Sequence, residues 1–74
     1  MSKELFIKQV GERIREIRKE KKLSLGKMSL LSDIKKSNLS RIESGKTNIT
    51  LGTLYTISQV LKVPVCDFFN DLAD

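Results

Sequence analysis

One short stretch, residues 35–48, gathers side chains that donate hydrogen bonds or carry positive charge. Its members are Lys35, Lys36, Ser37, Asn38, Ser40, Arg41, Ser44, Lys46 and Asn48. Lysine and arginine donate to guanine, asparagine can form a bidentate pair with adenine, and the cations neutralise phosphates. These residue types therefore support recognition of a nucleic acid. Charge alone leaves open the simpler interpretation that they only solvate helix faces.

Composition argues against catalytic and metal-binding chemistry. The sequence has no histidine and a single cysteine, Cys66. This excludes a histidine-based triad, a cysteine cluster around zinc and an intramolecular disulfide. No nucleophile stands beside a base. We therefore expect no enzyme, no catalytic residue, no metal and no cofactor, and we expect Cys66 to be a small, partly buried residue.

The charge of the 74 residues is unevenly distributed. The total is +5, and residues 47–74 carry a net charge of −2, so the first two thirds of the chain are strongly basic. Basic patches attract polyanions. No apolar run approaches the roughly 18 residues that span a membrane, and the start of the chain lacks the features of a signal peptide. We expect one cytoplasmic domain, residues 1–74, without a membrane partner or a small-molecule ligand.

Five helices must position these side chains. Helical spacing of apolar residues predicts them at 3–21, 25–32, about 35–44, from Leu51 to a stop at Pro64, and at about 65–71. Ser24 and Thr50 are predicted N-caps, and Gly45 is the predicted residue after the third helix. No segment alternates with period two, so we expect a compact all-α domain.

Most large apolar residues are expected in the core. They are Phe6, Val10, Ile14, Ile17, Leu23, Leu25, Met28, Leu31, Leu39, Ile42, Leu51, Leu54, Ile57 and Leu61. Further apolar residues in the last third of the chain lie outside a single core-facing stripe: Tyr55, Val60, Val65, Phe68 and Phe69. This set is either ordinary core or a homodimer interface, and we favour the interface.

The second and third helices form a helix-turn-helix pattern, since two short helices are joined by a few residues and the second one is polar and basic. Packing of the first two helices beneath it would hold the third helix above the surface. Such a helix fits the roughly 12 Å width of the major groove of B-DNA.

Four separated stretches together resemble the repressor and Cro class of lambdoid phages, often called the XRE family. The most specific runs from Leu39 to Lys46, and the others are Val10–Arg18, Thr53–Val63 and Phe68-Phe69. The resemblance covers about residues 10–70 and implies a five-helix repressor-like fold. The chain also resembles the small controller proteins of restriction-modification systems, in which the loop after the glycine is similar to Asn48-Ile49-Thr50-Leu51.

The resemblance implies roles for individual residues and a function. Base-reading candidates are Lys36, Ser37, Asn38, Ser40 and Arg41, and phosphate candidates are Ser24, Lys27, Lys35, Ser44, Lys46 and Asn48. Arg18 and Glu43 correspond to a structural ion pair of the family. The implied function is a sequence-specific transcriptional regulator that binds a palindromic operator in double-stranded DNA as a homodimer.

Several positions depart from the family pattern. Leu25 replaces a glutamine that contacts DNA, Lys35 replaces the usual cap of the recognition helix, and Asp33 stands where glycine often makes the turn. Ser29 replaces a usual alanine, and Pro64 replaces a usual cap. The alternative function is an antitoxin or another protein-binding module whose C-terminal surface masks a partner protein.

Overall fold

The computed structural model describes residues 1–70 and 72, and every regular element in that part is a helix. The elements are α1 (Lys3–Glu20), α2 (Leu25–Ser32), α3 (Lys36–Glu43), α4 (Leu51–Leu61) and the 3-10 helix η1 (Val65–Phe69). The all-α prediction is confirmed for these residues. The fifth element differs from the prediction, because the segment between Pro64 and an extended Asn70 is too short to develop α-helical hydrogen bonding. Its predicted end, residue 71, lies outside the described residues.

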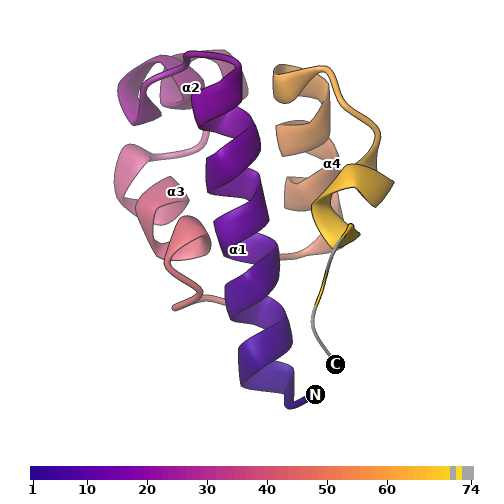
Figure 1. Ribbon diagram of the computed structural model, residues 1–74. Coiled ribbons are helices and arrows are strands. Elements are labelled where there is room, and N and C mark those ends of the chain that lie inside the picture. The colour runs from indigo at the N-terminus through magenta and orange to yellow at the C-terminus, as the bar shows by residue number, and fades with distance from the viewer. Residues whose placement is uncertain (71, 73–74) are drawn as a thin grey trace.

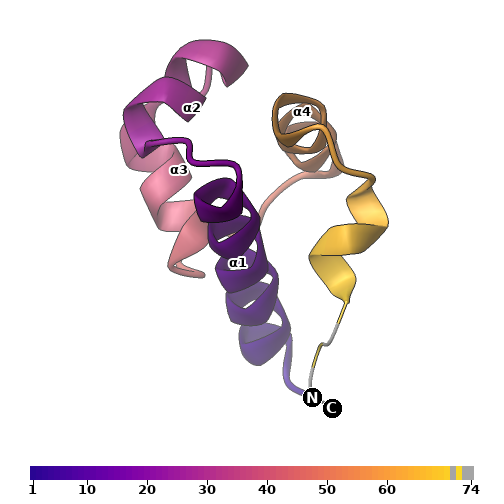
Figure 2. The same cartoon turned by 45° about the horizontal axis from the view of Figure 1, so that its top comes forward.

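Helix α1 is the central support of the fold. It runs through the middle of Figure 1, with α2 and α3 on one side and α4 and η1 on the other, and Figure 2 shows the same division after rotation. Arg13 fastens α1 to η1 by donating from its Nε to the carbonyl oxygen of Asp67 at 3.0 Å. The helix-turn-helix is thus attached to one face of α1 through α3, and η1 to another, while α4 packs against α2 and η1.

Side-chain caps begin most of the helices. Ser24 Oγ accepts from the backbone N–H of Lys27 at 3.0 Å, and Thr50 Oγ1 accepts from that of Thr53 at 3.1 Å. Both predicted caps are confirmed, and each satisfies an N–H group that the helix leaves unpaired. Asp33 ends α2 in the left-handed region at φ 60°, a conformation that aspartate tolerates better than most residues. The departure from glycine at this position is therefore accommodated.

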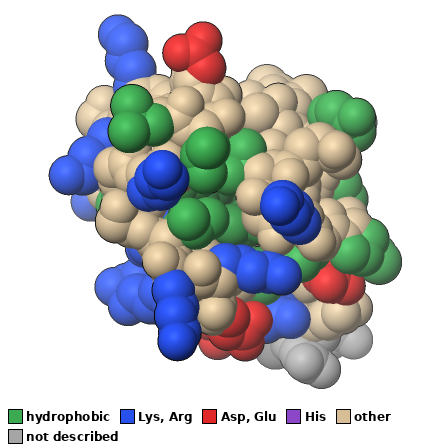
Figure 3. All heavy atoms as spheres, turned by 90° about the horizontal axis from the view of Figure 1, so that it is seen from above, with side chains coloured by type: hydrophobic (Ala, Val, Ile, Leu, Met, Phe, Trp, Pro, Cys, Tyr) green, Lys and Arg blue, Asp and Glu red, His purple; other side chains and the backbone are tan. Residues whose placement is uncertain are grey.

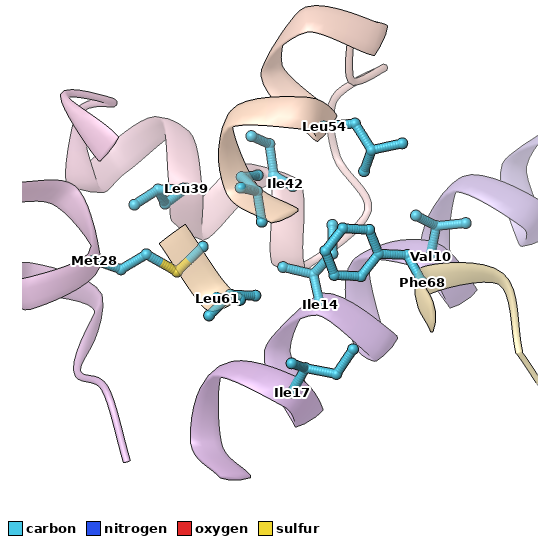
Figure 4. Packing of buried hydrophobic residues seen from close by; sticks show 10 residues of the cluster. Val10, Ile14, Ile17, Met28, Leu39, Ile42, Leu54, Leu61 and Phe68 are labelled. Atoms are coloured by element: carbon cyan, nitrogen blue, oxygen red, sulfur yellow. The ribbon is translucent and has the colours of Figure 1, made fainter. Parts of the chain in front are cut away.

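One apolar core holds the elements together. Figure 4 shows its side chains converging from α1, α2, α3, α4 and η1. The buried set is Val10, Ile14, Ile17, Met28, Leu39, Ile42, Leu54, Ile57, Leu61 and Phe68. Leu23, Leu25, Ile34 and Ile49 pack against this set while remaining partly exposed.

Three predicted core residues lie at the surface instead: Phe6, Leu31 and Leu51. Leu51 is 83% exposed because it occupies the first position of α4, before that helix reaches the core. Leu31 is 54% exposed because α2 turns the Met28–Ser32 stripe inward. Phe6 lies near the start of α1 and stacks on Phe69, with ring centroids 6.0 Å apart.

Two predictions for the segment after Pro64 are wrong. Phe68 is fully buried, so it belongs to the core and cannot form part of a dimer surface. Cys66 is exposed rather than partly buried. Both corrections follow from the tight turn of η1, which directs Phe68 into the core and leaves Cys66 outside.

Candidate nucleic-acid interface

Helix α3 is anchored by one face and exposed on the other. Leu39 and Ile42 are buried, whereas all five base-reading candidates on this helix are exposed. Helical periodicity sorts those five into three rows. Ser37 and Arg41 form the outermost ridge, Lys36 and Ser40 lie along one flank, and Asn38 lies along the other.

The flank of Asn38 borders a small hollow between α3 and the loop that follows it. Asn38, Asn48, Thr47 and Thr53 all line this hollow, whose volume is about 110 Å³. The structure therefore brings a base-reading candidate of α3 beside a phosphate candidate of the loop. Amide and hydroxyl groups of this kind can both donate and accept hydrogen bonds.

The opposite flank borders a larger hollow of about 290 Å³ between α3, α1 and the start of α2. Its lining residues are Arg15, Arg18, Leu25, Ser40, Glu43 and Ser44. Arg15 is not among the residues predicted from the sequence to contact DNA, although it lines this hollow. The available signal was its spacing, because Arg15 precedes Arg18 by three positions and so shares the face of α1 that meets α3.

Arg18 and Glu43 meet beneath this hollow in a buried ion pair. Arg18 Nε and Nη2 donate to Glu43 Oε2 and Oε1 at 2.7 and 3.0 Å, which is the bidentate geometry of a strong pair. Arg18 Nη1 also donates to the carbonyl oxygen of Leu23 at 2.7 Å. One guanidinium thus joins α1, the connection before α2 and the end of α3.

Two glycines allow α1 and α3 to approach closely. A methyl group on Gly11 would collide with the carbonyl oxygen of Ile42, and one on Gly45 would lie 2.7 Å from Lys8 Cα. Gly45 also has φ +75°, and the N–H groups of Gly45 and Lys46 bond to the carbonyls of Ile42 and Arg41. This is the Schellman pattern, which confirms the predicted helix end.

The N-terminus of α3 carries two cations and no side-chain cap. Lys35 occupies the cap position without a side-chain hydrogen bond, and Lys36 follows as the first helical residue. A helix N-terminus favours negative charge, so this placement works against the stability of the isolated helix. The other phosphate candidates, Ser24, Lys27, Ser44, Lys46 and Asn48, are exposed as well.

Basic side chains are more numerous on α1 and the helix-turn-helix than on α4 and η1. Figure 3 views the molecule from above, and most of the visible Lys and Arg side chains lie on the left, the side of α2 and α3. The right side, which α4 and η1 occupy, shows more hydrophobic groups. The asymmetry of charge along the sequence therefore becomes an asymmetry between two sides of the fold.

The dimer candidates differ in exposure. Tyr55 is 60% exposed and Phe69 is also exposed, while Val60 and Val65 are partly buried against the core. An apolar groove of about 260 Å³ lies beside Phe69 and is also lined by Phe6, Ile7, Val10, Leu51 and Leu54. The exposed part of the candidate set therefore continues into a larger apolar surface.

Within the described residues, no helix is long and apolar enough to cross a membrane, and no three potential metal ligands among His, Cys, Asp and Glu come together. Among residues 1–70 and 72, the ion pairs are Arg18 with Glu43, which joins α1 to α3, and Arg13 with Glu16 on α1.

A helix-turn-helix family model, HTH_3, matches residues 14–68. The HTH-type transcriptional repressor RghR of Bacillus subtilis (strain 168) is 33% identical over 55 residues, which make up 73% of this chain and 41% of that protein. The chain spans about two fifths of the length of the curated relatives that it matches.

Two solved structures share this fold over nearly their whole length. The restriction-modification controller protein C.AhdI from Aeromonas hydrophila has a TM-score of 0.82 and 27% identity, covering 85% of this chain and 96% of that one. The controller protein C.Esp1396I, solved as a tetramer in complex with its natural 35 base-pair operator, has a TM-score of 0.80 and 29% identity. That match covers 97% of this chain and 92% of the other.

Proposed function

We propose that this chain, which belongs to the HTH_3 (XRE-type) helix-turn-helix family, acts as a transcriptional regulator. In this proposal it binds specific DNA sequences in the cytoplasm. Helix α3 is the recognition helix and enters the major groove. Its ridge of Ser37 and Arg41, with Lys36 and Asn38 beside it, contacts base edges. The surrounding phosphate candidates hold the domain on the backbone. The proposal assigns no catalytic activity and requires no cofactor.

The observation that carries this proposal is the charge at the start of α3. Lys35 and Lys36 stand uncapped at the positive end of the helix dipole, where folding alone disfavours cations. Neither lysine has an ion-pair partner among the described residues. A polyanion that docks against this end would compensate both charges. Solvation of a helix face would not explain why the cations gather at this end.

A homodimer would place two such helices on one palindromic site. The acting unit is then a symmetric pair whose recognition helices lie about 34 Å apart, one turn of B-DNA. Support comes from the exposed apolar side chains of Tyr55 and Leu51 on α4 and of Phe69 on η1. The operator-bound C.Esp1396I neighbour is itself an assembly of several chains.

Substitutions on the ridge should weaken DNA binding and reduce its specificity. Arg41→Ala and Lys36→Ala are each expected to cost about 1–3 kcal/mol of binding free energy and to relax preference at one base pair. Lys3→Ala, a matched loss of charge at the far end of α1, should leave specificity unchanged. Unaltered affinity and specificity in both α3 variants would contradict the placement of α3 in the groove.

The measurement is selection from random duplex oligonucleotides, followed by titration of the selected site. We expect a palindromic site and an affinity that falls steeply between about 50 and 200 mM salt, because phosphate contacts release counterions. Recovery of no preferred sequence, together with a copurifying protein partner, would favour the antitoxin function instead.

The proposed dimer surface can be tested with two leucines of nearly equal exposure. Leu51 is 83% exposed beside the apolar groove, and Leu30 is 81% exposed on α2. Leu51→Glu should shift the sedimentation coefficient from dimer toward monomer, because a dimer would bury the new carboxylate. Leu30→Glu should leave the dimer intact. Equal behaviour of the two variants, or a monomeric parent protein at high micromolar concentration, would refute this interface.

A further inference from the structure

We propose that Arg15 of α1 binds a backbone phosphate of the DNA together with the hydroxyl of Ser40 on α3. This inference rests on the proposed function, and it adds α1 to the elements that contact DNA. The site is the hollow of about 290 Å³ between α1, α3 and the start of α2.

The electrostatics of this hollow suit a single anionic oxygen. Arg18 and Glu43 line its floor but neutralise each other in their bidentate pair. The side chain of Arg15 forms no hydrogen bond or ion pair with any described residue, although Glu12, Glu16 and Lys19 lie near it on the surface of α1. Glu16 pairs with Arg13 at 3.6 Å rather than with Arg15. The positive charge that remains in the hollow is therefore that of Arg15.

The hydrogen-bonding groups in the hollow supply the remaining donors. Ser40 has an exposed hydroxyl that bonds to no other described residue, so its O–H is available. Ser44 already donates to the carbonyl of Arg41 at 3.2 Å, and Leu25 offers only an apolar wall. An arginine and a free hydroxyl match the acceptor oxygens of a phosphate.

The position of the hollow favours DNA phosphate over a free anion. An α-helix with its side chains is about 10–12 Å across, close to the width of the major groove. A helix that fills the groove with its ridge of Ser37 and Arg41 brings its flanks against the sugar-phosphate strands. The flank that carries Ser40 lies directly over the Arg15 hollow. The strand on that side would lie over the hollow where α3 meets α1.

The test compares Arg15→Gln with Lys3→Gln on the selected operator and on unrelated duplex DNA. Both variants lose one positive charge on α1, and Lys3 lies twelve residues away, about 18 Å along the helix. Arg15→Gln should weaken binding about tenfold per half-site at 50 mM salt on both DNAs, and this loss should shrink about threefold per half-site by 200 mM salt, because each protomer lacks one phosphate contact. Lys3→Gln should leave the salt slope as it is. Because Arg15 is exposed, thermal denaturation should be the same for all proteins.

Ser40→Ala provides the second arm. If Ser40 shares a phosphate with Arg15, its loss should weaken binding to all sequences, and the double variant Arg15→Gln/Ser40→Ala should lose less than the product of the single losses. A change in preference at one base pair would instead make Ser40 a base reader and would overturn its part in the site.

Three results would overturn the inference. One is an unchanged salt slope for Arg15→Gln while the parent protein still binds its operator. Another is an equal loss for Lys3→Gln. The third is a shift of the Arg15 side-chain NMR signal with inorganic phosphate at constant ionic strength but none with operator DNA. If the parent protein itself shows no DNA binding, the proposed function fails instead, so the two failures are distinguishable.

Discussion

Glu43→Met is expected to lower the free energy of unfolding by about 3–5 kcal/mol, because it leaves the buried guanidinium of Arg18 without its counter-charge. Only the carbonyl of Leu23 would remain as an acceptor for Arg18. A domain of this size has a total stability of about 5 kcal/mol, so the variant should keep only about 0–2 kcal/mol and be partly unfolded at room temperature. Urea denaturation followed by circular dichroism measures the change.

Two further variants separate burial from charge. Glu16→Met removes the carboxylate of an exposed pair, Arg13 with Glu16, and should change stability by less than about 1 kcal/mol. The double variant Arg18→Met/Glu43→Met removes both buried charges and should recover most of the lost free energy of unfolding. Removing one partner of a buried ion pair leaves an unpaired charge, whereas replacing both partners by apolar residues leaves none. A double variant that is no more stable than Glu43→Met would show that the pair contributes through its hydrogen bonds to the fold rather than through charge balance.

Gly11→Ala should destabilise the domain by about 3 kcal/mol, although alanine is the better helix former. The new methyl group would overlap the carbonyl oxygen of Ile42, and backbone atoms cannot rotate away as a flexible side chain can. Helices α1 and α3 would have to separate, which also opens the space around the Arg18 pair. The melting temperature and the urea midpoint should both fall.

Gly26→Ala and Gly52→Ala are the matched controls. Both glycines lie in the first turn of a helix, and an added methyl group would approach no atom closer than 3.9 Å. Each substitution should stabilise the domain by up to about 1 kcal/mol through helix propensity and a restricted unfolded chain. If all three alanine variants were stabilising, the close approach of α1 and α3 would be refuted.

Features governed by local chemistry could be predicted from the sequence. Ser24 and Thr50 cap their helices, and Gly45 ends α3, because these residue types act within a few positions of themselves. The helix ranges follow from apolar spacing for the same reason. The exposure of most of α3 could also be predicted from the sequence, since Leu39 and Ile42 are the only apolar residues among its polar ones.

Features that depend on which elements cross could not be predicted. The spacing of Phe68 in the sequence does not tell whether its side chain packs into the core of its own chain or against a partner chain. The turn of η1 places it in the core of its own chain. The spacing of Leu31 is helical, yet α2 buries Met28 and Ser32 and leaves Leu31 exposed. Arg15 and Gly11 acquire their surroundings only because α1 passes beside α3.

Two arginines of α1 each donate a hydrogen bond to a main-chain carbonyl oxygen of another segment. Arg18 donates to the carbonyl of Leu23, and Arg13 donates to that of Asp67. A main-chain acceptor is the same whatever side chain it carries, so residues 23 and 67 can drift in evolution without loss of these bonds. Their substitutions need not be matched by changes at the arginines. Covariation between related sequences would therefore miss two of the contacts that fasten the connection before α2 and the C-terminal turn to α1.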